Sequence, residues 1–579
     1  MKLSQLNVIP TSRDNVDIFG GYNHNVRIGD GEFYDMKNLT SSHYPALSPR
    51  GKRGTYLKAT SPQGLIAKDS LCYVDGSKFI INEYPIEMGL NDEPKQLISM
   101  GAYVIIMPDK KYINTIDHND RGDIEAEFDT TSDVEFSLCM VDGVDYENIE
   151  YGAQPTNPEN MDLWLDSSST PNCLKQYSET SKTWVTVPTT YIKISSPGIG
   201  TAFKQYDGVT ISGIKAKELQ DLNANTVIWE CKDNYIVVRG ILDKLSTQTA
   251  DEGSIKISRK MPKMDFITES ENRLWGCRYG TSANGDVVNE IYACKLGDFK
   301  NWNCFMQVST DSYVAPCGTD GQWTGAITHM GYPLFFKENC VHKVYGNYPS
   351  NYQIQTTACR GVQKGCSDSL AIVNEVLYYK SRNAVCAYDG SLPVEISTAL
   401  GDIAYSDAIA CSHGNKYYIS MKDASNEYSL FVYDTSKKLW HKEDDLAVKE
   451  FCSCRNELYY IPQNSNEIKT MLGGGDVDAD PVKWMAETGI LGMFTPDKKY
   501  ISRLNLRMSL DVGTKVRIYI QYDSCGEWTL VSSMISTSIR NFSIPLKPRR
   551  CDHFRIKIEG EGNGKIYSIS KTLEQGSDV

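Results

Sequence analysis

The residue types best suited to catalysis, histidines and carboxylates, are spread along this chain without a recognisable constellation. The eight histidines lie far apart, and neither HxxxH nor HExxH occurs. There is no GxSxG turn and no Walker loop. The sequence therefore predicts a protein that is not an enzyme and has no catalytic residues, metal or cofactor. A composite site built from distant segments stays open.

Carboxylates are concentrated in one segment. Between Asn114 and Asp166 there are 15 Asp and Glu against one base, Arg121, a local charge of −14 in a chain of net charge −13. The stretch DHNDRGDIEAEFD at 117–129 superficially resembles a calcium loop, but Arg121 and Phe128 occupy ligand positions. We interpret it as a solvated acidic loop. The candidate functional residues within it are Asp117, Asp120, Asp123, Glu125, Glu127 and Asp129.

A second segment, near the C-terminal end of the sequence, is basic. From Asp497 to Lys557 there are 12 Lys and Arg against 5 Asp and Glu. The 17 cysteines are scattered singly and fit no zinc ribbon or redox CxxC, which indicates synthesis in a reducing compartment. No apolar leader opens the chain, and no run is long enough for a membrane-spanning helix. We expect neither Sec-dependent secretion nor a membrane span.

A repeated phrase indicates how the chain is built. NEVLYYK, NKYYIS and NELYYI begin at Asn374, Asn415 and Asn456, each 41 residues after the one before. Each phrase starts at a turn residue and runs into strand-forming residues. A period near 41 built from short strands is typical of β-propeller blades, which bury their faces against one another. We predict six to eight blades, seven being the central value; a row of hairpins or a β-sandwich is the alternative.

Two segments break the repeat, which gives the predicted domains. The fold class is all-β: a propeller with a small inserted β domain and a C-terminal β-sandwich, the latter indicated by clean apolar–polar alternation. The predicted boundaries are an N-terminal arm at 1–57 leading into the first blade, blades at 58–135 and 221–480, the insertion at 136–220, and the sandwich at 481–579.

Four stretches resemble known phage proteins. The segment FGGYNHNVRIGDGEFYDMKNLTSSHYPALSPRGKRG (19–54), with Glu32, Asn38 and P.L.PR, resembles the opening of propeller-bearing bacteriophage tail proteins. The blade ENRLWGCRYG…NEIYACKLGDFKNWNCF (271–305) looks like their most recognisable blade. YDSCGEW…PRRCDHFRIKIEGEG resembles a terminal sandwich of structural proteins of phages with Gram-positive hosts, and 162–187 looks like small β modules of phage fibres and baseplates.

The resemblance implies a virion component similar to tail-nozzle or tail-stabilisation proteins, made in the host cytoplasm. Such proteins form rings, commonly hexamers, below the portal and adaptor and extend the channel for genomic DNA. An acidic lumen repels phosphate, so the segment 114–166 is expected to face DNA without sequence-specific binding, and the basic 497–557 region an acidic neighbour. Two alternatives are a host-surface glycan-binding tail protein and a propeller glycoside hydrolase or lyase.

Overall fold

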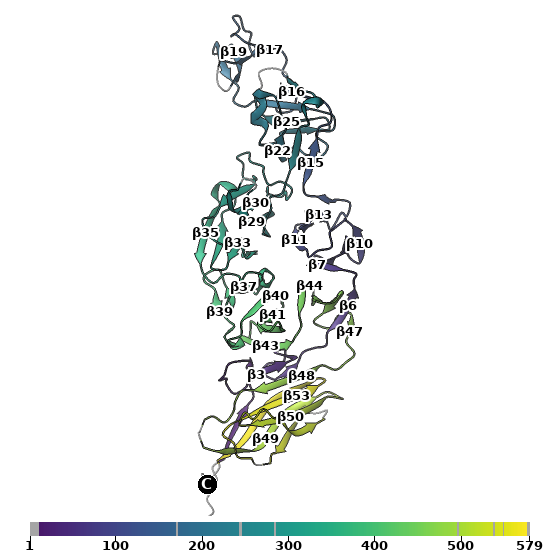
Figure 1. Cartoon of the computed structure of the whole chain (residues 1–579), viewed down its shortest axis with the longest axis vertical. Helices are drawn as coiled ribbons and strands as arrows, with labels where there is room; N and C mark the ends of the chain where they lie inside the picture. The colour runs from purple at the N-terminus through teal and green to yellow at the C-terminus, as the bar shows by residue number, and fades with distance from the viewer. Residues whose placement is uncertain are drawn as a thin grey trace, which may run out of the picture. The chain divides into compact units, whose positions relative to one another are not determined.

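The computed structural model describes residues 11–168, 172–241, 246–282, 285–494, 497–535, 539–547 and 549–575 (Figure 1). Strands dominate these ranges, and their only helices are 3₁₀ turns at Lys217–Leu222, Ala250–Glu252, Pro349–Asn351, Ser367–Ser369 and Thr398–Leu400. No helix in the described ranges is long and apolar enough to span a membrane. The chain divides into two compact units, Met1–Lys95 with Phe336–Val341 and Thr357–Val579, and Gln96–Phe335 with His342–Thr356.

The first unit contains antiparallel groups of four strands that mostly follow one another along the chain; two of the groups are separate sheets and two are parts of larger sheets of ten and five strands. The last of these groups along the chain begins at Val448 and takes its fourth strand from the N-terminal part of the chain, because β46 pairs with β6. The strands are β7–β10 at Pro62–Ala67, Leu71–Asp75, Lys78–Ile81 and Tyr84–Glu87; β36–β39 at Ala371–Val373, Val376–Lys380, Val385–Tyr388 and Val394–Glu395; β40–β43 at Tyr405–His413, Lys416–Asp423, Tyr428–Asp434 and Leu439–Asp444; and β44–β46, β6 and β47 at Val448–Cys454, Glu457–Pro462, Glu467–Thr470, Gly54–Lys58 and Asp476–Val477.

The 41-residue repeat marks one position in these sheets. Asn374, Asn415 and Asn456 all lie in the hairpin turn between the first and second strands of successive sheets. Positive φ angles occur at these turns, 47° at Asn374 and 54° at Arg455, a conformation that asparagine adopts more readily than most residues. The apolar faces of successive sheets pack together, as Leu430 and Val432 do with Phe451 and others. This packing explains why each phrase repeats the same apolar residues.

The second unit contains sheets of the same plan, and the core residues Ile98, Ile105, Ile267 and Leu274 join two of them. The strands are β11–β14 at Gln96–Met100, Tyr103–Met107, Lys111–Asn114 and Arg121–Asp123, and β28–β31 at Phe266–Ser270, Arg273–Thr281, Val287–Ala293 and Tyr313–Pro316. A further sheet, β32–β35, has strands at Gly325–His329, Tyr332–Lys337, Cys340–Tyr345 and Gln353–Ala358, which fall on both sides of the division between units. The predicted all-β, blade-based fold is confirmed, and the blade number stays a prediction.

The inserted domain is longer than the sequence suggested. The predicted range was 136–220, but β15 pairs with β27 and β21 pairs with β25, so its sheets run from Ala126 to Arg259. The run KDNYIVVRG at 232–240 therefore belongs to the insertion and not to a blade. A strand with this apolar pattern fits a blade and the insertion equally well. Phe136, Ile192 and Ile236 share one buried core, which decides the assignment.

The insertion consists of three sheets, ordered β15-β27-β22-β23, β24-β25-β21-β16-β26 and β17-β18-β19-β20. Their strands are β15 to β20 at Ala126–Asp129, Val134–Cys139, Ile149–Tyr151, Leu163–Asp166, Cys173–Ser178 and Thr183–Thr186, and β21 to β27 at Tyr191–Ser195, Gly208–Ser212, Asn225–Val227, Glu230–Lys232, Tyr235–Arg239, Ser246–Gln248 and Lys256–Arg259.

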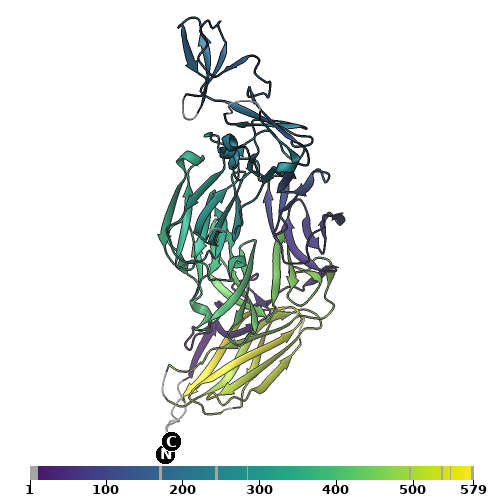
Figure 2. The ribbon, with the colours of Figure 1, turned by 45° about the horizontal axis from the view of Figure 1, so that its top comes forward.

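The C-terminal part of the first unit is a β-sandwich, as predicted. One sheet has the order β1-β54-β49-β52, and the other contains β48-β53-β50-β51 and continues through β3 and β2 to β43. The N-terminal strands β1 and β3 thus join the sandwich instead of simply leading into a blade, and Figure 2 shows them in purple against the yellow strands. The strands are β1–β5 at Thr11–Val16, Gly21–Tyr22, Glu32–Lys37, Leu39–Thr40 and Ser48–Pro49, and β48–β54 at Lys483–Thr488, Lys499–Leu510, Lys515–Tyr522, Thr529–Met534, Arg540–Pro545, Phe554–Glu561 and Gly564–Gln575.

Candidate functional site: the carboxyl pair Glu450 and Asp368

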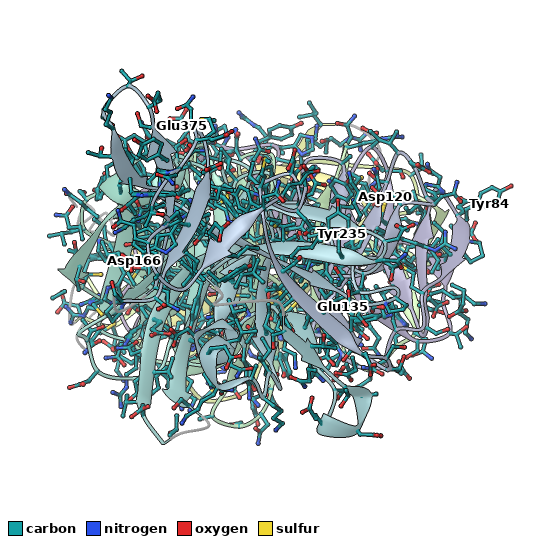
Figure 3. All side chains as sticks on the ribbon, turned by 90° about the horizontal axis from the view of Figure 1, so that it is seen from above. Tyr84, Asp120, Glu135, Asp166, Tyr235 and Glu375 are labelled. Atoms are coloured by element: carbon teal, nitrogen blue, oxygen red, sulfur yellow. The ribbon has the colours of Figure 1, made fainter. Side chains whose placement is uncertain are left out.

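The acidic segment singled out from the sequence does not form one site. Asp120 accepts hydrogen bonds from the hydroxyls of Tyr103 (2.7 Å) and Tyr112 (3.2 Å), and the bond from Tyr103 lowers its pKa. Asp117 accepts a hydrogen bond from the backbone N–H of Asn119. Figure 3 labels Asp120 together with three acidic residues of other elements, Glu135 in β16, Asp166 in β18 and Glu375 in the turn between β36 and β37.

The remaining candidates lie close to four lysines, all of which are outside the acidic segment. Hydrogen bonds from Lys256 and Lys260 lower the pKa of Glu127 to about 2. Counting charge along the sequence alone overstates the local negative charge, because strand pairing brings these lysines to the segment. The contacts are Asp123 with Lys111 (2.8 Å), Glu125 with Lys110 (2.6 Å), Glu127 with Lys256 (2.8 Å) and Lys260 (2.7 Å), and Asp129 opposite Lys256 in the strand register. That these residues face a channel stays a prediction.

The first unit holds a pair of carboxyl groups that the sequence did not indicate. Glu450 lies on β44, the first strand of its sheet, at a register shift that follows Val448. Such a bulge turns a side chain away from its regular direction. The Oε1 atom of Glu450 accepts a hydrogen bond of 2.7 Å from the backbone N–H of Leu65 in β7. The bulge therefore directs this carboxyl toward the first strand of a neighbouring sheet.

The surroundings of Glu450 favour its neutral form. Burial, followed by the nearby charge of Asp368, raises the pKa of Glu450 to about 8. Burial among protein atoms also raises the pKa of Asp368, although part of its surface reaches solvent. Asp368 lies in the short 3₁₀ turn Ser367–Ser369 and accepts a hydrogen bond from Ser367. At neutral pH, Glu450 thus retains its proton in much of the population.

This arrangement suits two roles. A carboxyl group that is protonated near neutral pH, beside a second carboxyl, is what general acid–base hydrolysis of glycosides requires. The second role is structural, because the neighbouring Lys449 links the same two strands. Its Nζ donates to the carbonyl of Pro62 and to Gln63 Oε1, both at 2.8 Å. The sequence signal, Lys-Glu inside an apolar strand, is too common to have identified the pair. Among the described residues, no group of three or more His, Cys, Asp or Glu is placed to hold a metal ion.

Replacing Glu450 by Gln is expected to change how stability depends on pH. The raised pKa means that the folded wild-type chain binds this proton more tightly than the unfolded chain, so Glu450 costs stability as pH rises from about 4.5 toward 8 and above. The Gln variant lacks this loss. Melting temperatures should match at low pH, and the variant should melt higher above pH 8; equal melting curves there would contradict the assigned pKa.

Most of the 17 cysteines are buried. Burial raises the pKa of several, including Cys72 and Cys231 to about 11. Buried thiols of raised pKa are poor nucleophiles and pack as small apolar groups. Synthesis in a reducing compartment stays a prediction.

Comparison with known proteins gives only distant structural likenesses. No protein-family model matches the sequence, and no curated protein matches it significantly. An exo-β-1,3-galactanase from Phanerochaete chrysosporium is 8% identical, with 53% of this chain and 94% of that chain covered and a TM-score of 0.20. A family 43 arabinoxylan arabinofuranohydrolase from Bacillus subtilis is 9% identical, with coverages of 52% and 94% and a TM-score of 0.19. A Cry1Da core from Bacillus thuringiensis is 10% identical, with coverages of 54% and 52% and a TM-score of 0.13.

These comparisons correct one expectation. The sequence predicted a protein that is not an enzyme, and that prediction is contradicted because the similar structures include several glycoside hydrolases. What these structures share with this chain is the β fold. At these identities and TM-scores they carry no argument about the substrate or mechanism of this chain.

Proposed function

We propose that this chain is a structural component of a bacteriophage tail or neck, a ring subunit that extends the DNA channel below the portal and adaptor. The observation that supports this proposal most is the role of the residues in the N-terminal segment that resembles phage tail proteins. They join strands that are hundreds of residues apart in the first unit, and they form no catalytic arrangement.

Asn38 is central to this junction. Its φ of 55° turns the chain after β3, its Nδ2 donates to the carbonyl of Lys483 (2.7 Å), and its Oδ1 accepts from Arg50 Nε (2.8 Å). Gly21 is equally constrained, because a Cβ atom there would lie 2.4 Å from the carbonyl oxygen of Trp440. Glu32 accepts a 2.6 Å hydrogen bond from the N–H of Gly29. Asn38 and Gly21 thus connect one blade sheet to the sandwich, whereas the Glu32 bond is local.

A junction of this kind suits a part that holds its shape under load. The ten-stranded sheet runs from β40 through β43, β2 and β3 to β48 and on to β51, so backbone hydrogen bonds connect the blade sheet to the sandwich without a linker. We propose that the acidic segment 114–166 faces the channel, where passing DNA is not retained. We also propose that copies of the chain form the ring, with a hexamer expected.

The sandwich offers a surface for an acidic neighbour. A groove of about 410 Å³ crosses β48, β53 and β50 and is lined by four cations and two acids, Lys37, Lys483, Lys515 and Arg517 with Glu559 and Glu561. The excess of two positive charges favours an acidic protein surface. This extends the interpretation of the basic 497–557 region, because Lys37 and Lys483 lie outside that range and reach the groove through strand pairing.

Reversing two charges in this groove should weaken assembly. The variant Lys483→Glu with Lys515→Glu is expected to bind the portal–adaptor complex at least about tenfold more weakly, because rim charges then repel the acidic partner. Lys58→Glu changes an exposed lysine of the same unit, outside both the groove and the 497–557 region, and serves as the control. Sedimentation of mixed components measures the effect, and unchanged co-sedimentation of the double variant would exclude this surface.

A second candidate function rests on the pair Glu450 and Asp368. A protonated carboxyl on β44 and a second carboxyl on the neighbouring 3₁₀ turn suit the hydrolysis of host-surface polysaccharide, which a tail protein also meets. Glu450→Gln and Asp368→Asn should each abolish release of reducing ends, while both variants remain folded. If the wild-type chain does not hydrolyse capsular or cell-wall polysaccharides, this second function is excluded, and the role of Glu450 is the hydrogen bond that joins β44 to β7.

A further inference from the structure

A pocket of about 450 Å³ lies in the first unit, between the β37–β38 hairpin and the segment that leads into β40; β37 and β40 are labelled in Figure 1. Its floor is made of buried side chains, Val385, Leu400, Tyr405 and Met421. Its volume falls within the roughly 300–1,000 Å³ of small-ligand sites, which combine an apolar floor with a few convergent polar groups. Size and floor are therefore those of a binding site.

Contacts within the unit fix one wall of the pocket. The N–H of His24 donates to the carbonyl of Ala399 (2.8 Å), and Asn25 Nδ2 donates to the carbonyl of Thr398 (2.8 Å). Gly401 has a φ of 75°, and a Cβ atom there would lie 2.9 Å from the carbonyl oxygen of His24. The wall is thus held by hydrogen bonds and close approach, so the pocket is formed before any ligand arrives.

The charged groups at the floor and back are already engaged. Lys380 Nζ donates to Gln363 Oε1 (2.9 Å) and to the carbonyl of Ser381, and burial lowers its pKa. Glu395 forms an ion pair with Arg360 at 2.7 Å. Arg360 balances the charge of Glu395, whereas the N–H groups of Lys380 are directed to neutral oxygen atoms of the protein and away from a ligand.

Four exposed side chains on the rim are different. Within the described chain, the side chains of Arg382, Asn383, Thr398 and Asp402 make no hydrogen bond or ion pair with another residue, yet all four line the pocket. Together they offer a guanidinium, an amide, a hydroxyl and a carboxylate, with a net charge of zero. This set provides both donors and acceptors in a small space.

We infer that the pocket binds an uncharged polyhydroxylated ligand, one or two sugar residues of a neutral oligosaccharide. Carboxylate and amide groups accept from and donate to sugar hydroxyls, and the zero net charge of the rim gives no attraction to a polyanion. The inference does not depend on the proposed ring function or on the carboxyl pair, since none of the four rim residues belongs to either.

The experiment uses the full-length chain and calorimetric titration with the trimers of glucose in α-1,4 and β-1,4 linkage and of N-acetylglucosamine, with a heparin trisaccharide as the charged comparison. At least one neutral trimer should bind, and Asn383→Ala and Asp402→Ala should each weaken binding about tenfold, the effect of losing one or two hydrogen bonds. Gln463→Ala, an exposed change away from the pocket, should bind like the wild type.

Three results would overturn the inference: no neutral trimer binding at about 10 mM, which corresponds to less than about 3 kcal/mol; binding that is unaffected by both rim variants; or binding of the charged trisaccharide alone. Because the substituted side chains are exposed, loss of folding is not expected, and circular dichroism of each variant confirms this.

Discussion

Replacing Arg53 by Met is expected to destabilise the first unit by about 3–5 kcal/mol, the usual cost of removing one partner of a buried ion pair. Arg53 is 7% exposed, and its guanidinium donates to Asp444 (2.7 Å) and to Glu443 (2.9 Å). Arg50 lies farther from the same carboxylates, at 3.6–3.7 Å. Without Arg53, two largely buried negative charges lose their main counterion.

The measurement is urea denaturation followed by intrinsic fluorescence. Lys37→Met is the control, because Lys37 and Asp445 form an exposed pair at 3.2 Å that should contribute no more than about 1 kcal/mol. Adding Glu443→Gln and Asp444→Asn to Arg53→Met should recover much of the lost stability. An Arg53 variant as stable as the Lys37 variant would show that the ion pairs of Arg53 with Glu443 and Asp444 do not stabilise the first unit.

Replacing Gly560 by Ala should also be strongly destabilising. Gly560 lies on β53 beneath the indole of Trp484, and an added Cβ atom would lie 2.1 Å from two ring carbons. Trp484 is 3% exposed, and its Nε1 donates to the carbonyl of Gly562 (2.9 Å), so the ring has little room to move. Overpacking of this kind costs about 1–3 kcal/mol and sometimes more.

Gly51→Ala is the matched control, since an added Cβ atom there meets nothing within 4 Å. The two variants should differ clearly in thermal unfolding: the midpoint of Gly560→Ala falls and that of Gly51→Ala stays close to the wild type. If Gly560→Ala melts like Gly51→Ala, the indole does not occupy the position assigned to it.

The sequence predicted the parts of the fold that depend on local patterns. Asn374, Asn415 and Asn456 mark hairpin turns because turn chemistry and strand formation are properties of adjacent residues. The same reasoning misplaced 232–240, because an apolar strand looks alike in a blade and in the insertion. Only its pairing with β21 decides between them.

The candidate site could not be predicted from the sequence, because its contacts join residues that are far apart along the chain. Glu450 meets Leu65 across 385 positions of sequence, and a bulge sets its direction. Likewise, Lys256 lies 129 positions from Glu127, so a count of charges within one segment could not include it. The resemblance to phage proteins pointed to Asn38, whose partners in β48 appear only in the folded chain.

The most direct test of the proposed ring function is mass photometry of the chain alone and with the purified portal–adaptor complex of its phage, followed by cryo-electron microscopy of any assembly. The account predicts a ring of several copies, six being expected, attached to the adaptor with residues 114–166 toward the channel. A strict monomer in the presence of the portal–adaptor complex would contradict the ring function, and a ring with 114–166 on its outer surface would contradict the acidic lumen.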